Sequence, residues 1–291
     1  MQKEGGKQMS IQTIAVVGAG TMGRGIIETA ATHGINVLAV EVDETQREAA
    51  AALIEQSVDR AIKRGKLDVD DPAEVLGRID YVDNLQSAVE DAQFVIEAVS
   101  ENEELKLSIF KKLNSACPAD VVLASNTSSI SITRLASATT RPAQVIGMHF
   151  FNPVPVMAPV EIVCGAETSE STIETTRTLA EQMGKQAFAV QDKPGFVVNR
   201  VLMPLINEAV FALQDGVADA DTIDSLMKLG CNHPMGPLQL ADLVGLDVCL
   251  SILQVLHRDL ADEKFRPCPL LEQKVAAGQL GRKSSQGFYQ Y

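Results

Sequence analysis

The sequence predicts a doubly wound α/β domain with a mostly parallel sheet, followed by a second domain built only of helices. Short β-branched runs recur through residues 11–192, and stretches of helical length and pattern separate them. Beyond Pro194 such runs stop, except at the last few residues. A repeated order of strand, helix and strand builds a parallel sheet covered by helices on both faces.

The expected strands are apolar runs without polar alternation, a pattern typical of parallel strands that are buried on both faces. They are Ile14–Val17, Val37–Val40, Phe94–Ile96, Val121–Leu123 and Val145–Met148, with Val160–Val163 and Ala187–Val190 as late strands of the same sheet. Helices are expected between them at Thr21–His33, Glu44–Arg64 and Glu103–Ala116.

The pair Pro194-Gly195 marks a change of pattern, because proline and glycine interrupt regular structure. We therefore expect a flexible tail at residues 1–10, an α/β domain at residues 11–193 and a helical domain at residues 194–291. The helices expected in the second domain are Phe196–Leu213, Asp221–Leu229, Leu238–Leu260 and Pro269–Ala277.

The composition excludes several classes of partner. The chain has 291 residues and a formal net charge of -13, and such a field repels nucleic acid, whose binding relies on Lys and Arg. Five cysteines occur without a Cys-x-x-Cys pair, which is typical of a reduced cytoplasmic protein rather than of a disulfide framework. No apolar run approaches the roughly 18 residues of a membrane span. We expect no metal site and no nucleic-acid or membrane partner.

A complete G-x-G-x-x-G motif follows the first expected strand and opens a helix. It is Gly18-Ala19-Gly20-Thr21-Met22-Gly23. Gly18 permits the tight turn, Gly20 lets a pyrophosphate approach the backbone, and Gly23 lets the helix pack against the strand. The N-terminus of that helix offers N–H groups to the phosphates. Strand, turn and helix in this order indicate a Rossmann-type dinucleotide-binding domain.

An acidic residue stands where the second expected strand ends. Glu41 lies 18 positions after Gly23, close to the ~20 positions expected for the acid that binds the ribose hydroxyls. A carboxylate there repels a 2′-phosphate, so we expect NAD rather than NADP as the cofactor. Arg47 is nearby, and its positive charge works against this preference.

A set of polar residues lies in apolar or turn-forming segments, where each side chain needs a partner. The set contains Asn126-Thr127-Ser128-Ser129, His149, Glu161 and Asn199. Each also has a structural interpretation: a turn for the first segment, a core histidine, and a buried helix–helix hydrogen bond for Asn199. Glu161 lies within Pro-Val-Glu-Ile-Val, where an unpaired carboxylate is costly to bury, and His149 is its expected partner. Together these groups suit the removal of a proton from an alcohol.

Five segments carry a resemblance to a known family. They are Gly-Ala-Gly-Thr-Met-Gly, Asn-Thr-Ser-Ser, His-Phe-Phe-Asn-Pro-Val-Pro-Val-Met, Pro-Gly-Phe-Val-Val-Asn-Arg and the terminal Gly-Arg-Lys-Ser-Ser-Gln-Gly-Phe-Tyr. In combination they resemble the L-3-hydroxyacyl-CoA dehydrogenases, most closely the bacterial 3-hydroxybutyryl-CoA dehydrogenases of similar length. The resemblance covers nearly the whole chain after the tail. It implies NAD-dependent oxidation of an L-3-hydroxyacyl-CoA, or the reverse reaction, by a homodimer formed through the helical domain.

The resemblance also implies roles for the polar set. His149 is the expected general base, which takes the hydroxyl proton as hydride leaves C3. Glu161 holds the imidazole and stabilises its protonated form. Ser128 and Asn199 are expected to hydrogen-bond the reacting oxygen and the thioester region of the substrate.

Further site residues follow from the same match. The implied cofactor-binding residues are the six of the glycine motif together with Glu41, Glu101, Lys106, Ser128, Asn152 and Lys283. Ser57 and Arg64 match substrate-contacting positions, in addition to Ser128 and Asn199. The basic cluster Lys63-Arg64-Gly65-Lys66 suits the phosphates of CoA, and it is equally well explained as a solvated helix end.

The sequence departs from the family pattern at three places. After the glycine motif it has Arg24-Gly25-Ile26-Ile27-Glu28, where a small residue and Ile-Ala-Gln are usual. Glu41 replaces the usual aspartate, and Ala158-Pro159 stands where Lys-Leu is common. Arg24 and Glu28 are expected near the cofactor or at the mouth of the active site. These changes bear on specificity more than on the type of reaction.

The sequence leaves other classes of function open. A related NAD-dependent hydroxy acid dehydrogenase of the L-gulonate type uses much the same serine, histidine and asparagine. A 3-hydroxyisobutyrate type would need a catalytic lysine in Gly-x-Gly-x-x-x-Lys, which is absent after the domain boundary. The intact set from Ser128 to Asn199 argues against a non-enzymatic NAD-binding protein of the lens-crystallin kind. The sequence specifies neither the acyl-chain length nor the direction of the reaction.

Overall fold

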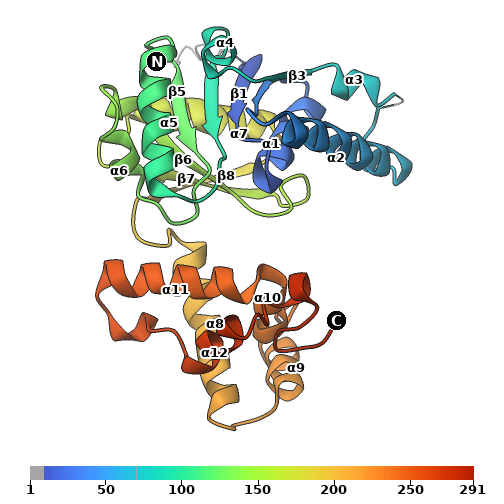
Figure 1. The fold of residues 1–291 in the computed structure, drawn as a ribbon, viewed down its shortest axis with the longest axis vertical. Helices are drawn as coiled ribbons and strands as arrows, with labels where there is room; N and C mark the ends of the chain where they lie inside the picture. The colour runs from blue at the N-terminus through green and yellow to red at the C-terminus, as the bar shows by residue number, and fades with distance from the viewer. Residues whose placement is uncertain (1–9, 70) are drawn as a thin grey trace, which may run out of the picture. The chain divides into compact units, whose positions relative to one another are not determined.

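The computed structural model describes residues 10–69 and 71–291, so nearly all of the expected tail lies outside the described residues. Residue contacts divide the chain into two compact units, and the division falls between Asp192 and Lys193. The first unit combines a sheet with helices, and the second is helical (Figure 1). The fold class that the sequence predicts is confirmed by this arrangement.

The first unit is built around an eight-stranded sheet with the order β3-β2-β1-β4-β5-β6-β7-β8. Its strands are β1 (Thr13–Val17), β2 (Asn36–Val40), β3 (Ile79–Val82), β4 (Phe94–Glu97), β5 (Val122–Ser125), β6 (Val145–Phe150), β7 (Pro159–Cys164) and β8 (Gln186–Gln191). Neighbours from β3 to β6 pair in parallel, β7 is antiparallel to β6, and β8 is parallel to β7. The first six strands follow the order 3-2-1-4-5-6 of dinucleotide-binding domains, in which the ligand lies beyond the carboxyl ends of the strands where the order reverses. Strands β1 and β4 flank that point.

Helices connect the strands of the first unit. They are α1 (Thr21–Thr32), α2 (Glu44–Lys63), α3 (Ala73–Leu76), α4 (Leu85–Glu90), α5 (Glu103–Ala116), α6 (Ile132–Ala136) and α7 (Glu170–Gln182). The side chains of Asp43 and Asn102 cap the N-termini of α2 and α5, because each accepts a hydrogen bond from a backbone N–H of the first turn. Helix α1 differs: its N-cap is Gly20, and no side chain caps it.

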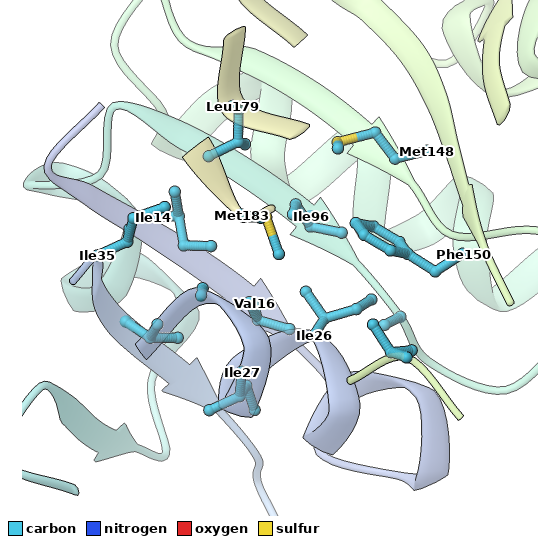
Figure 2. Close-up of a cluster of buried hydrophobic side chains, with 14 of the residues drawn as sticks. Ile14, Val16, Ile26, Ile27, Ile35, Ile96, Met148, Phe150, Leu179 and Met183 are labelled. Atoms are coloured by element: carbon cyan, nitrogen blue, oxygen red, sulfur yellow. The ribbon is translucent and has the colours of Figure 1, made fainter. Parts of the chain in front are cut away.

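The main hydrophobic core lies between the sheet and helices α1 and α7 (Figure 2). It contains Ile14 and Val16 of β1, Ile96 of β4, Met148 and Phe150 of β6, Ile26 and Ile27 of α1, Leu179 of α7, and Met183, which follows α7. Side chains alternate between the two faces of a strand. His149, between two core residues of β6, therefore points away from this core.

The second unit consists of α8 (Val198–Gln214), α9 (Ala220–Cys231), α10 (Pro237–Val244), α11 (Leu246–Leu260) and α12 (Pro269–Ala276). The expectation of one helix over Leu238–Leu260 is wrong, because Gly245 interrupts it with a φ of +105°. Glycine adopts this left-handed backbone readily, and a helix does not continue through it. The sequence also gave no indication of β3, whose side chains are only partly buried.

Two buried carboxylates hold the terminal Gly-Phe-Tyr segment against the helices of the second unit. Asp242 accepts hydrogen bonds from the backbone N–H groups of Phe288 and Tyr289, each at 2.9 Å. Asp224 accepts one from the Tyr289 hydroxyl at 2.9 Å. A Cβ atom at Gly287 would lie 2.0 Å from Asp242 Oδ1, so only glycine fits there. These contacts explain why the C-terminal motif has Gly287 and Tyr289.

Within the part of the chain that the structure describes, no single helix is both long and apolar enough to cross a membrane. The bent pair α10 and α11 meets that test only when both helices are taken together. The same described residues contain no group of three or more His, Cys, Asp or Glu placed to hold a metal ion. Cys117, Cys164, Cys249 and Cys268 are buried free thiols, and Cys231 is an exposed one.

Candidate active site

The glycine-rich turn between β1 and α1 has the geometry that a dinucleotide phosphate needs. Gly18 has a φ of +98° and donates its N–H to the Val40 carbonyl at 2.8 Å. A Cβ atom at Gly23 would lie 1.9 Å from the Gly18 carbonyl oxygen, so any side chain there is excluded. A Cβ atom at Gly20 would meet nothing within 4 Å, which leaves the space beside Gly20 open. The first N–H groups of α1 lie at this turn and have no acceptor within their own helix.

Glu41 follows the last residue of β2 and lies directly against the glycine-rich turn. Its Oε2 accepts a hydrogen bond from Ala19 N at 3.2 Å, and its Oε1 accepts one from Asp43 N at 3.2 Å. Arg47 donates to the Glu41 carbonyl at 2.8 Å, so its guanidinium is engaged with the backbone of this residue. The carboxylate therefore lies at the end of the second strand, in contact with the glycine-rich turn.

Glu101 organises the Asn-Thr-Ser-Ser turn that follows β5. Its Oε1 accepts hydrogen bonds from Thr127 Oγ1 at 2.6 Å, Ser128 N at 2.8 Å and Ser129 N at 3.0 Å. The hydroxyl of Ser128 also donates to this oxygen at 3.1 Å. Burial would raise the pKa of Glu101, but the Lys106 ammonium and these donors hold that pKa below its usual value. The carboxylate is therefore ionised and fixes the position of Ser128.

Lys106, a residue implied for the cofactor, is fully buried behind this turn. Its ammonium lies 2.7 Å from Glu97 Oε1 and 3.6 Å from Glu101 Oε2. Glu97 also accepts hydrogen bonds from Ser125 Oγ at 2.6 Å and from Val99 N at 2.7 Å. Glu97 was not among the predicted site residues. Its position at the end of the apolar run Phe-Val-Ile is the sequence feature that could have indicated it. Lys106 thus supports Glu101 from inside the protein.

His149 and Glu161 face each other across the antiparallel pair of β6 and β7. The register places them directly opposite, and His149 Nδ1 lies 2.7 Å from Glu161 Oε2. His149 is 8% exposed and Glu161 is 4% exposed, so the pair is largely shielded from water. The Phe151 ring packs against the imidazole, with 4.8 Å between ring centroids. The partnership expected from the sequence is therefore present.

Two asparagines lie next to the strand that carries His149, one through a hydrogen bond and one through its position in the chain. Asn126 Oδ1 accepts a hydrogen bond from Phe150 N at 3.0 Å, which ties the start of the Asn-Thr-Ser-Ser turn to the strand that carries His149. Asn152 is exposed and precedes Pro153 through a cis peptide bond. The two turns implied for cofactor and substrate are thus linked through one strand.

Asn199 and Lys283 belong to the second unit. Asn199 lies in the first turn of α8 and is buried. The ammonium of Lys283 lies 2.6 Å from Asp247 Oδ1, at the start of α11. The structure describes these residues within their own unit, and the other implied site residues lie in the first unit.

Ser57 and Arg64 line a single cavity of about 310 Å³ in the first unit. Arg60 and Lys66 line it too, so the cavity has a basic rim. The Ser57 hydroxyl donates a hydrogen bond to Glu28 Oε1 at 2.8 Å. Glu28, which the sequence led us to expect near the cofactor or at the mouth of the active site, therefore lies against Ser57 in this cavity. That contact was not predictable from the sequence, because it joins helices α1 and α2.

The strand order, the uncapped first helix and the turn that is open beside Gly20 define a dinucleotide-binding domain of the Rossmann type. The family model for 3-hydroxyacyl-CoA dehydrogenase, NAD binding domain, matches residues 13–193. The model for 3-hydroxyacyl-CoA dehydrogenase, C-terminal domain, matches residues 195–291. The chain belongs to the 3-hydroxyacyl-CoA dehydrogenase family, and it is an NAD-dependent enzyme.

Individual relatives agree with this assignment. The chain is 51% identical over 283 residues to a probable 3-hydroxybutyryl-CoA dehydrogenase of Bacillus subtilis, covering 97% of this chain and 98% of that protein. It is 46% identical over 281 residues to a 3-hydroxybutyryl-CoA dehydrogenase of Bradyrhizobium diazoefficiens, covering 97% and 96%. The crystal structure of (S)-3-hydroxybutyryl-CoA dehydrogenase from Ralstonia eutropha matches with a TM-score of 0.93 and 48% identity, covering 97% of this chain and 99% of that one. The family resemblance seen in the sequence is confirmed.

Proposed function

We propose that this enzyme oxidises the C3 hydroxyl of L-3-hydroxybutyryl-CoA with NAD, or catalyses the reverse reaction. The observation that carries the chemistry is the 2.7 Å contact between His149 Nδ1 and Glu161 Oε2 in a shielded strand pair. The observation that favours this substrate is the name shared by relatives that are 46% to 51% identical over nearly the full chain.

His149 acts as the general base in this proposal. Glu161 accepts a hydrogen bond from Nδ1, so the proton of the neutral imidazole resides on Nδ1 and the lone pair resides on Nε2. Nε2 takes the proton of the substrate hydroxyl, and the Glu161 carboxylate stabilises the imidazolium that forms. In the reverse direction the same nitrogen returns the proton to the substrate oxygen.

NAD supplies the hydride acceptor for C3. Gly18, Gly20 and Gly23 fit its pyrophosphate, because the turn is open at Gly20 and closed to side chains at Gly23. Glu41 is suited to bind the ribose hydroxyls and disfavours a 2′-phosphate. We assign the remaining cofactor contacts to Ala19, Thr21, Met22, Glu101, Ser128, Asn152 and Lys283. Lys106 contributes to this site by holding Glu101 ionised and in place.

Substrate binding is assigned to four residues in this proposal. Ser128 and Asn199 hydrogen-bond the reacting oxygen and the thioester region, which holds C3 in its reactive orientation. Ser57 and Arg64 contact the CoA portion, since they line one cavity with a basic rim. Phosphate groups are attracted to such a rim.

We also propose an oligomeric state and a cellular location for the enzyme. Exposed apolar side chains on and beside α8 and α9, among them Val201, Val217, Leu226 and Leu229, suit a homodimer formed through the helical domain. The net charge of -13 and the unpaired cysteines suit a cytoplasmic enzyme that binds no nucleic acid and no membrane.

A substrate panel followed at the nicotinamide absorbance tests this proposal. L-3-hydroxybutyryl-CoA with NAD should give the highest kcat/KM, above longer hydroxyacyl-CoA thioesters, free hydroxy acids such as L-gulonate, and any reaction with NADP. Faster oxidation of a free hydroxy acid would assign the enzyme to the L-gulonate type instead. NAD binding without turnover of any compound would favour the crystallin-like alternative.

A further inference from the structure

Glu28 is an acidic residue inside a cavity whose rim is basic. It belongs to α1, is 7% exposed, and accepts a hydrogen bond from Ser57 of α2 at 2.8 Å. The same cavity is lined by Arg60, Arg64 and Lys66.

The surroundings of Glu28 oppose its ionisation. Burial raises the pKa of this carboxyl, and the Ser57 hydrogen bond and the Arg60 charge only partly offset that rise. An ionised Glu28 would also repel any phosphate drawn to the basic rim of the cavity. A neutral Glu28 would exert no such repulsion.

We propose that Glu28 sets the affinity of this cavity for the phosphorylated part of CoA and couples CoA binding to uptake of a proton by the Glu28 carboxyl. The inference rests on the proposed function, because it takes CoA as the ligand of the cavity. The geometry that carries it is a largely buried carboxylate that is hydrogen-bonded to Ser57 in a cavity also lined by Arg60, Arg64 and Lys66.

The charged groups that face Glu28 determine the sign of the effect. Helix α2 presents Arg60, its C-cap is Arg64, and Lys66 follows it. His33 at the end of α1 also lines the cavity. The turn after Pro153 presents Pro155, which carries no charge. A bound phosphate raises the Glu28 pKa further, so CoA binds more tightly relative to a neutral analogue as the pH falls through that pKa. Substitution by glutamine removes the charge and keeps an acceptor for Ser57.

Calorimetric titration with CoA and with pantetheine, which lacks the phosphates, tests this inference. At about pH 8, Glu28→Gln should bind CoA on the order of 3- to 10-fold more tightly than the wild type. The affinity for pantetheine should not change. At about pH 5 the advantage for CoA should shrink, because wild-type Glu28 is then more protonated. Titrations in buffers of different ionisation enthalpy should show that the wild type takes up more protons per CoA than Glu28→Gln.

Glu55→Gln is the matched control, because Glu55 lies on α2 two residues from Ser57, is exposed, and does not line the cavity. It should bind CoA like the wild type, which separates a local effect of Glu28 from the general loss of one negative charge. Equal CoA affinity and equal proton uptake in wild type and Glu28→Gln would overturn the inference and leave the proposed function intact. Absence of CoA binding by the wild type would overturn both.

Discussion

Two regions of the first unit each bury a glutamate, and they use it in opposite ways. In the strand pair β6–β7, Glu161 contacts an imidazole at 2.7 Å. Between helices α1 and α2, Glu28 contacts the Ser57 hydroxyl at 2.8 Å. Both carboxyls are over nine-tenths buried, so burial alone does not distinguish them. The difference lies in the partner: in the proposed mechanism a histidine that gains a proton requires an ionised carboxylate, whereas the phosphate proposed for the cavity favours a neutral one.

Removal of the imidazole should have the largest effect on activity. His149→Ala should lower kcat by about 10²- to 10⁴-fold, because a positioned general base contributes that much to a proton transfer. NAD binding, followed by quenching or calorimetry, should be retained. Wild-type turnover in this variant would show that β6–β7 is not the proton-transfer site.

A third glutamate of the first unit, Glu41, is expected to disfavour the 2′-phosphate of NADP. Glu41→Ala should shift the ratio of kcat/KM for NAD and NADP toward NADP by about five- to tenfold, since the repulsion of a 2′-phosphate is lost. Steady-state kinetics with both cofactors measures the ratio. An unchanged ratio would mean that Arg47 or the turn itself sets cofactor preference.

The pH dependence of thermal stability should show smaller effects of the buried glutamates. The pKa of Glu28 is raised in the folded state, so its ionisation destabilises the fold as the pH rises above the ordinary value of 4.5. Glu28→Gln should therefore raise the melting temperature at neutral pH by a few degrees, and the gain should vanish toward acid pH. Thermal unfolding across that range measures it, and a melting temperature lowered at neutral pH would contradict the raised pKa.

Glu101 predicts the reverse trend. The pKa of this carboxyl is lowered in the folded state, so the stability it contributes is present above pH 4.5 and is lost as the pH falls through the lowered pKa. Glu101→Gln should lower the melting temperature at neutral pH, with less effect in acid. The same unfolding series provides the measurement, and a gain in stability for Glu101→Gln would show that the donors of the Asn-Thr-Ser-Ser turn do not require a charge.

The fold was largely predictable because strands buried on both faces are continuous apolar runs. Strand β3 escaped prediction since Asp80 and partial burial break that pattern, and the interruption at Gly245 was hidden in an apolar helical stretch. The turn at Gly18 was predictable because the phosphate-binding geometry is encoded locally.

The site was predictable only where its residues lie in recognisable segments. His149 and Glu161 are 12 residues apart, and the antiparallel register that joins them follows from two adjacent strands. Glu28 and Ser57 are 29 residues apart on packed helices, and no local pattern indicates their contact. The contact between Glu28 and Ser57 is therefore seen only in the packing of helices α1 and α2.

We propose that Glu161 serves the chemical step and that Glu28 serves ligand binding. Steady-state kinetics of Glu161→Gln and Glu28→Gln with L-3-hydroxybutyryl-CoA and saturating NAD separate these two roles. Glu161→Gln should lower kcat by about 10-fold or more, because the imidazolium loses its counter-charge, whereas Glu28→Gln should act on KM for the CoA thioester and lower it. A wild-type kcat in Glu161→Gln, or a KM for Glu28→Gln that is unchanged or raised, would contradict the distinction.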